Sequence, residues 1–201
     1  MIIITSFKLS YNISKGFFNV HSEESETGNR CPLCGSPLVY RDHKLRGLKD
    51  NAGKKSMYFL RRLLCQACLK LHTEIPSIIQ PYKHYDSETI QSVLDGSEGA
   101  DACAADDSTI RRWRSDFTKA APDITLRMAS VYSQLTDKKT PIGFSSTISI
   151  AAIQAKVKYW LSFVMALLIN CGHKLCTQFA FCPPPLVDKI GLKYKTTVIR
   201  R

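Results

Sequence analysis

Four cysteines in two matched pairs are the residues of this chain best suited to chemistry. The pairs are Cys31-Pro-Leu-Cys34 and Cys65-Gln-Ala-Cys68, with 30 residues between them. Each C-x₂-C pair spans one tight turn that aims two sulfurs at one point, and four thiolates can close a tetrahedral Zn²⁺ site. The spacing predicts one structural zinc ion, because four protein ligands leave no position for a catalytic water.

Two other interpretations of the pairs stay open. His72, four residues after Cys68, could replace a cysteine as a ligand. A C-x₂-C pair can also be a redox motif, but that motif normally opens a helix after a strand, which two copies around a hairpin do not fit. Away from the pairs, scattered buried thiols are a simpler interpretation than a second site for the irregularly spaced Cys171, His173, Cys176 and Cys182.

The segment between the pairs must bring the second turn beside the first. Short strand-like runs at 38–40 and 57–60 bracket a polar turn with Asn and Gly at 49–55, which predicts a β-hairpin. Gly35 can take the positive φ that turns backbone N–H groups toward the sulfurs, whereas the second pair lacks this glycine. The expected element is a zinc ribbon over 30–80.

A helical pattern follows the expected ribbon. Residues 86–96 read as a helix begun by Asp86 or Ser87 and stopped by Gly96. A second helix over 107–119, capped by Asp107 or Ser108, buries Ile110, Trp113 and Phe117 at i, i+3 and i+7. This order predicts a helix-turn-helix over 81–120. Its candidate DNA contacts are Ser108, Thr109, Arg111 and Arg112 for bases and Arg114 for phosphate.

An ordinary amphipathic helix with a solvated basic face accounts for this second helix equally well. Acidic residues around the helix (Asp95, Glu98, Asp101, Asp106 and Asp107) would repel phosphate. The neighbouring basic ribbon would offset part of that repulsion. Spacing alone does not separate the two interpretations.

Several pieces of the run 31–117 resemble an uncharacterised bacterial family of zinc-ribbon proteins that is associated with mobile elements. The arrangement is also similar to the N-terminal DNA-binding region of insertion-sequence transposases. The resemblance implies DNA recognition and a protein partner from a mobile element, and it covers roughly 90 of the 201 residues. The matching pieces are Cys31-Pro-Leu-Cys34-Gly35, Leu63-Leu-Cys65-Gln-Ala-Cys68, His72-Thr-Glu-Ile-Pro76, Pro81-Tyr-Lys-His-Tyr85 and Asp107-Ser-Thr-Ile-Arg-Arg-Trp-Arg114.

Charge is distributed in blocks. The formal net charge is +11, with ten basic and three acidic residues in 30–75, six and ten in 76–137, and ten and one in 138–201. Such a chain suits a polyanionic partner.

We expect an α+β protein with a small N-terminal zinc ribbon followed by a mostly helical region. Its expected parts are an N-terminal segment over 1–29, the ribbon over 30–80, the helix-turn-helix over 81–120 and a helical region with a basic tail over 121–201.

The helical part is expected to include helices over 124–135 and 149–170. The apolar stretch 159–169 is shorter than the roughly 20 residues that a membrane span needs, so a buried helix and no membrane partner are expected. The start of the chain carries no secretory signal pattern, and paired C-x₂-C turns in such a chain read as metal ligands. A reducing cytoplasm is the expected compartment.

Catalysis is not expected. Beyond Asp137 the only acidic residue is Asp188, so the region cannot supply the carboxylates that a two-metal nuclease requires. Two functions of different classes remain. The first is a DNA-binding protein, either a regulator or a recognition protein of a mobile element, that reads DNA with the helix 107–119. The alternative is a non-catalytic, zinc-stabilised adaptor that binds another protein.

Overall fold

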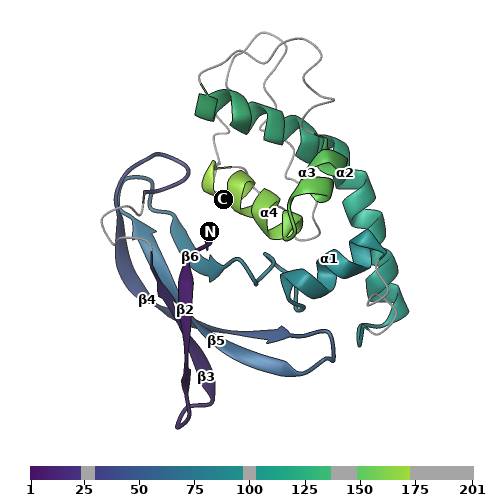
Figure 1. Ribbon diagram of the computed structural model, residues 1–201. Helices are drawn as coiled ribbons and strands as arrows, with labels where there is room; N and C mark the ends of the chain where they lie inside the picture. Colours follow the sequence, from purple (N-terminus) through teal and green to yellow (C-terminus); the bar gives the residue numbers. More distant parts are fainter. Residues whose placement is uncertain (24–29, 97–102, 137–148, 173–201) are drawn as a thin grey trace, which may run out of the picture.

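The computed structural model of the protein describes residues 1–23, 30–96, 103–136 and 149–172. In these residues the chain forms six strands and four helices (Figure 1). The strands are β1 (Ile2–Ile4), β2 (Phe7–Asn12), β3 (Phe17–Ser22), β4 (Leu38–Lys49), β5 (Lys55–Cys65) and β6 (Leu71–Pro76). The helices are α1 (Ser87–Asp95), α2 (Asp107–Thr136), α3 (Ile150–Lys156) and α4 (Trp160–Asn170).

All six strands belong to one curled, mixed sheet that resembles half of a barrel. β5 is its centre: β4 pairs with it antiparallel along its length, while β3 and β6 share its opposite edge. β2 extends the sheet from β3 as a hairpin partner, and β1 lies parallel to β6. The predicted hairpin between the cysteine pairs is therefore present, as the long β4–β5 pair.

The predicted fold class, a small N-terminal zinc ribbon followed by a mostly helical region, is wrong. Residues 2–22 form three strands, and these join β4–β6 in the single sheet. The difference arises from the parallel pairs β1–β6 and β3–β5, which join residues more than 35 positions apart. The hairpin is therefore the middle of a larger sheet and not a free-standing ribbon.

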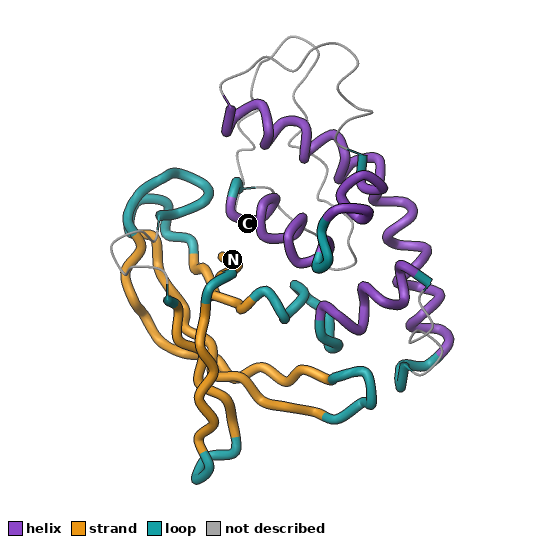
Figure 2. Tube along the Cα trace, viewed as in Figure 1, coloured by secondary structure: helices purple, strands orange, loops and turns teal. Residues whose placement is uncertain are grey.

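The helices gather on one side of the sheet (Figure 2). α1 is bounded as predicted, because the Asp86 side chain accepts a hydrogen bond from Thr89 N and Gly96 closes the helix with φ 64°. α2 is longer than predicted: it runs through Pro122 and joins the two expected helices 107–119 and 124–135 into one. The expected helix over 149–170 is instead two helices, because extended backbone at Val157 ends α3 before α4 begins at Trp160.

One hydrophobic core joins the sheet to the helices. It combines sheet residues such as Leu60 and Ile75, each at most 1% exposed, with Ile90 of α1, Ile124 of α2 and Trp160 of α4. Phe117 of α2 packs its ring against Trp160, with the ring centroids 5.3 Å apart. In the part of the chain that the structure describes, no helix has the length and apolar character needed to cross a membrane.

Candidate metal centre and basic hollow

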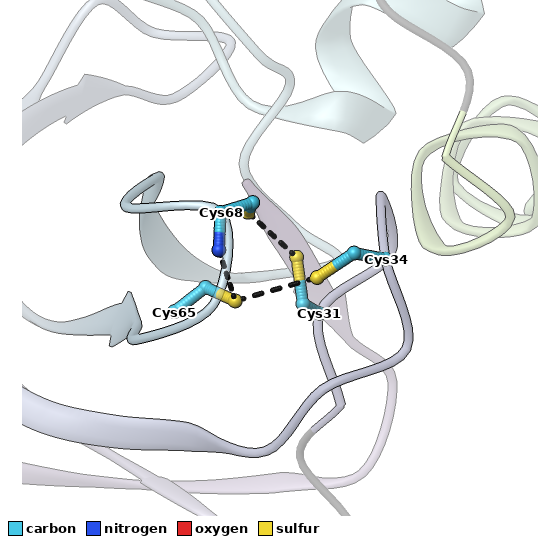
Figure 3. A group of neighbouring side chains, drawn as sticks. All are labelled: Cys31, Cys34, Cys65 and Cys68. Carbon is cyan, nitrogen blue, oxygen red and sulfur yellow. Dashed lines mark hydrogen bonds between the residues drawn. The ribbon is translucent and has the colours of Figure 1, made fainter.

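The four predicted ligands converge on one point (Figure 3). The Sγ atoms of Cys31 and Cys68 lie 3.6 Å apart, those of Cys34 and Cys65 lie 3.4 Å apart, and all four lie within 4.8 Å of one another. Four donor atoms at such separations can hold a single metal ion. The cluster confirms that these cysteines form one metal-sized site.

The two cysteine turns share one backbone design. In each turn the N–H of the first cysteine donates to the carbonyl five residues later: Cys31 to Ser36 at 2.8 Å and Cys65 to Lys70 at 2.9 Å. Gly35 provides the expected positive φ in the first turn, 74°. In the second turn Leu69 takes that conformation, with φ 57°, although a side chain makes it unfavourable.

Replacing Leu69 with glycine is expected to stabilise the protein by about 0.5 kcal/mol. The left-handed conformation costs a residue with a side chain roughly 1–2 kcal/mol, and glycine avoids this cost. Glycine also has a larger conformational entropy in the unfolded chain, which reduces the gain in stability. Leu69 is 75% exposed, so little buried surface is lost. Gly35→Ala is the control with the opposite sign: a Cβ there meets nothing within 4 Å, and only backbone strain acts. Urea denaturation gives the free energy of unfolding of both variants. A Leu69→Gly protein less stable than the wild type would contradict the prediction.

The surroundings of the cluster shift the pKa values of two of its thiols, Cys34 and Cys68, in opposite directions. Hydrogen bonds from the backbone and hydroxyl of Ser36 lower the pKa of Cys34 to about 6. Desolvation raises the pKa of Cys68 to about 12. Without a cation, four thiolates this close would repel one another, so a metal ion is what would stabilise the fully deprotonated set.

His72 lies beside the cluster and does not replace a cysteine in it. Its side chain is 2% exposed, and its Nε2 lies 3.4 Å from the Sγ of Cys31. Its Nδ1 lies 2.9 Å from the amino group of Met1. An N–H directed at a thiolate orients the sulfur and offsets part of its negative charge, which is how neighbours of metal ligands act.

The first cysteine turn is packed against the end of α4. A Cβ at Gly172 would lie 2.3 Å from the carbonyl oxygen of Pro32, so only glycine permits this approach. Just before it, Asn170 accepts a hydrogen bond from Ile3 N at 2.9 Å and donates one to Ile3 O at 2.8 Å. The metal centre, β1 and α4 are thus held together, although they are far apart in sequence.

The alternative second site finds no support in the residues that the structure describes. Cys171 caps α4 and does not join a metal-sized group, and burial raises its pKa. His173, Cys176 and Cys182 lie outside the described residues. Cys103 is partly buried against the core.

The predicted DNA contacts lie in the first two turns of α2. The helix is capped by Asp106, one residue earlier than expected, because its Oδ1 accepts from Thr109 N at 2.7 Å. Hydrogen bonds from the Ser108 hydroxyl and from Thr109 lower the pKa of Asp106 to about 2. The hydroxyls of Ser108 and Thr109 are therefore engaged in capping.

The three arginines of α2 differ in their surroundings. Arg111 and Arg112 are exposed, and their hydrogen bonds to described residues go to Asp107 O and to Thr109 Oγ1 of the same helix. Arg114 donates from Nε to the carbonyl of Val93 at 3.2 Å and so joins α2 to α1. Trp113, 2% exposed, anchors the same turn in the core, where its ring meets Tyr85 edge-on.

The two helices are not joined by a short turn. α1 ends at Asp95 and α2 begins at Asp107, with residues 97–102 outside the described part of the chain. A helix-turn-helix joins its helices through three or four residues. The spacing here is longer, in keeping with the corrected fold class.

A basic hollow of about 580 Å³ opens beside the start of α2. We define it by three walls: the hairpin end with Gly47, Lys49 and Lys55, the loop 82–85, and the α2 residues Asp106, Thr109, Arg112 and Trp113. Sequence reasoning missed this grouping. The hairpin turn and the Pro81–Tyr85 motif were visible, but nothing in the sequence placed either beside α2.

Two other cations of the sheet, Arg61 and Arg62, are paired with carboxylates. Arg61 donates to both oxygens of the buried Glu74, at 2.6 and 3.2 Å. Arg62 donates to both oxygens of Asp42, which lowers the pKa of that carboxyl. The basic residues of 30–75 that remain without a carboxylate partner include Lys49 and Lys55 of the hollow, for which the described residues provide no ion pair.

Comparison with known families gives one match. Residues 31–113 match the model of a domain of unknown function (DUF6431). The comparison with curated proteins and the comparison with solved structures gave no match. The matched region runs from the first cysteine of the metal centre to Trp113 of α2, so the metal centre and the basic hollow lie within it together.

Proposed function

We propose that this protein is a zinc-stabilised DNA-binding protein that contacts DNA through the start of α2. The observation that carries the proposal is the exposed pair Arg111 and Arg112, on a capped helix whose next residue, Trp113, is fixed in the core. Exposed arginines on a rigid helix can donate two hydrogen bonds to guanine or pair with phosphate. A regulator or a recognition protein would use such a surface.

Zinc is the metal that suits the cluster best. Four Zn–S bonds of about 2.3 Å in a tetrahedron place the sulfurs roughly 3.8 Å apart, close to the separations of 3.4 and 3.6 Å here. All four positions would be filled by protein, so the ion would act as a scaffold and not as a catalyst. Its effect would reach α4 through the contact of Gly172 with Pro32.

Electrostatics favour DNA as the partner. The start of α2 faces the lysines of the hairpin end across the hollow. Of the two acids at the start of α2, Asp106 directs its oxygens to Ser108 and Thr109, whereas Asp107 is exposed. A phosphate approaching this region would therefore meet cations on two sides.

The proposal predicts that Arg111→Gln weakens DNA binding about tenfold or more. A lost bidentate contact to a base costs roughly 1–3 kcal/mol, and the preferred sequence should relax at the position that Arg111 reads. The control is Lys119→Gln, which removes an equally exposed charge two turns later on the same helix. The measurement is fluorescence anisotropy with a duplex obtained by unbiased selection. Equal affinities for the two variants would refute the reading role of α2.

One observation favours the second class, an adaptor that binds another protein. In the described part of the chain β4 pairs along its length with β5, and its other edge carries one bridge, from Lys49 to Tyr85; the strand exposes Val39, Tyr40 and Leu45 at 37, 56 and 48%. A strand edge with exposed apolar side chains can accept a partner's strand. Binding of a protein partner that Tyr40→Ser abolishes, together with no DNA binding at low salt, would favour this function over the first.

A further inference from the structure

Two of the three walls of the basic hollow, the hairpin end and the loop 82–85, lie outside the helix that is proposed to read DNA. Its hairpin wall is held to the loop by backbone hydrogen bonds, since Lys49 N donates to His84 O at 2.7 Å and Asp86 N donates to Lys49 O at 2.9 Å. The side chain of Arg46 is half-buried, and one of its guanidinium nitrogens donates to the carbonyls of Gln80 and Lys83, both at 2.8 Å. The loop therefore keeps one shape before any ligand arrives.

Three cations (Lys49, Lys55 and Arg112) line the hollow, and the described residues give none of them an ion pair, although Lys49 also borders a second cavity that Asp50, Asp86 and Glu88 line. Lys49 and Lys55 are directly opposite each other in the β4–β5 register, an arrangement in which two like charges repel. Both are exposed, and Lys49 Nζ lies over the ring of Tyr85 at 5.5 Å from its centroid. Arg112 adds a third exposed charge from the opposite wall. An anion between the walls would turn this repulsion into attraction.

The carboxylates near the hollow are occupied by other groups. Asp106 accepts three hydrogen bonds from Ser108 and Thr109 at 2.5–3.0 Å, and these use both of its oxygens. Asp116 lies 4.0 Å from the Nζ of Lys83, which is 7% exposed and forms the floor of the hollow. The charge of Lys83 is thus shared with Asp116, while the charges of Lys49, Lys55 and Arg112 face the opening.

Backbone strain marks the rim of the hollow. Tyr82 has φ 61°, the left-handed conformation that a bulky residue avoids, and its side chain is 50% exposed. Residues in this conformation persist where the surrounding structure fixes them, and they cluster at functional sites. The clamp by Arg46 fixes this one, and it leaves an exposed aromatic ring next to a cluster of cations.

We propose that the basic hollow is a seat for a phosphate group of the nucleic-acid backbone. The proposal rests on the proposed function and deepens it, because it separates two tasks on α2. Arg112 and Thr109 line the hollow and would hold the phosphate together with Lys49 and Lys55, whereas Arg111 lies outside it and stays free for a base edge. The seat would then fix the register in which the helix meets the DNA.

The first test titrates inorganic phosphate into the full, metal-loaded chain and follows backbone amides by NMR. The expected result is saturable shifts confined to 47–55, 82–85 and 106–113, which are lost in Lys55→Gln. The control variant is Lys44→Gln, an exposed lysine of the paired strand β4 that does not line the hollow. Shifts scattered over the surface, or shifts equally reduced in both variants, would overturn the seat.

The second test measures DNA affinity of the same two variants over a range of salt concentrations. Lys55→Gln should lower the affinity and make the slope of log K against log salt shallower by about 0.9, the value for one lost phosphate contact. Lys44→Gln should leave the slope unchanged. Thermal melting of both variants checks that they are folded.

The outcomes distinguish the two proposals. Wild-type DNA binding with equal effects of Lys55→Gln and Lys44→Gln overturns the seat and leaves the DNA-binding proposal standing. A wild-type protein that binds no DNA, but whose hollow binds inorganic phosphate in a manner that Lys55→Gln abolishes, ends the DNA-binding proposal and keeps an anion site. Loss of both signals in the wild-type protein overturns both.

Discussion

Cys65→Ser is expected to release the metal and to destabilise the protein by more than about 4 kcal/mol. Cys65 is 0% exposed and lies at the junction of β5 with the second cysteine turn, so the loss reaches the centre of the sheet. A structural metal ion contributes its binding free energy to folding, and loss of such an ion is among the few single changes with effects this large. Because the first turn contacts Gly172, α4 should loosen as well.

Elemental analysis and thermal melting measure this prediction together. We expect one zinc per wild-type chain and less than a tenth of that in Cys65→Ser. Cys103→Ser is the matched control, since Cys103 is a described cysteine outside the cluster, and it should keep its zinc. A Cys65→Ser protein that retains metal and melts with the wild type would show that the cluster has no structural role.

Trp113→Ala should cost about 3–5 kcal/mol and should also remove DNA binding. Trp113 is 2% exposed, and its ring meets Tyr85 edge-on with the centroids 5.3 Å apart. Truncation loses the buried area of the ring and leaves a cavity where α2 meets the loop of the basic hollow. Arg112, the residue before Trp113, would then no longer be held toward the lysines of the hairpin.

Comparison with Trp113→Phe separates the loss of packing around the ring from the displacement of the start of α2. Phenylalanine keeps most of the ring contact, so it should lose less stability and retain measurable DNA affinity. Urea denaturation gives the two free energies of unfolding, and anisotropy gives the two affinities. Undiminished DNA binding by a folded Trp113→Ala would mean that the start of α2 does not carry the interaction.

Local chemistry made parts of this structure predictable. The two C-x₂-C turns are short-range features, and their sulfurs do meet. The caps of α1 were predicted because Asp86 and Gly96 act on backbone groups within four residues of themselves. Where near neighbours in the chain decide a residue's role, sequence reasoning came close: the caps of α1 were found, and the cap of α2 was placed one residue late.

Long-range pairing was not predictable in the same way. β1 consists of three buried isoleucines that pair with β6, more than 70 residues later, while the backbone N–H and carbonyl of Ile3 bond the side chain of Asn170. β2 has no buried residue and so lacks a core-facing pattern. Strands of this kind show no local signal that separates them from loops, which is why the sheet was mistaken for an isolated ribbon.

The predicted boundaries of the later helices were wrong in opposite ways: two expected helices are one, and one expected helix is two. Two helices over 107–119 and 124–135 are expected, yet α2 continues through Pro122 and carries Ile124, 1% exposed, into the core. The apolar run after Ser149 predicts one helix, yet the backbone turns at Val157 so that Trp160 can donate its indole N–H to Asp95 at 2.9 Å. In both places tertiary packing outweighed local preference.

The salt dependence of DNA affinity in the metal-loaded wild-type protein tests the central claim most directly. The account places Arg112, Lys49 and Lys55 around one hollow, without carboxylate partners among the described residues. Each neutralised phosphate contributes about −0.9 to the slope of log K against log salt, and the hollow is proposed to hold a phosphate, so log K should fall linearly with log salt with a slope of about −1 or steeper. A protein that holds one zinc per chain but binds no duplex at low salt, or binds it with a flat slope, would contradict the account.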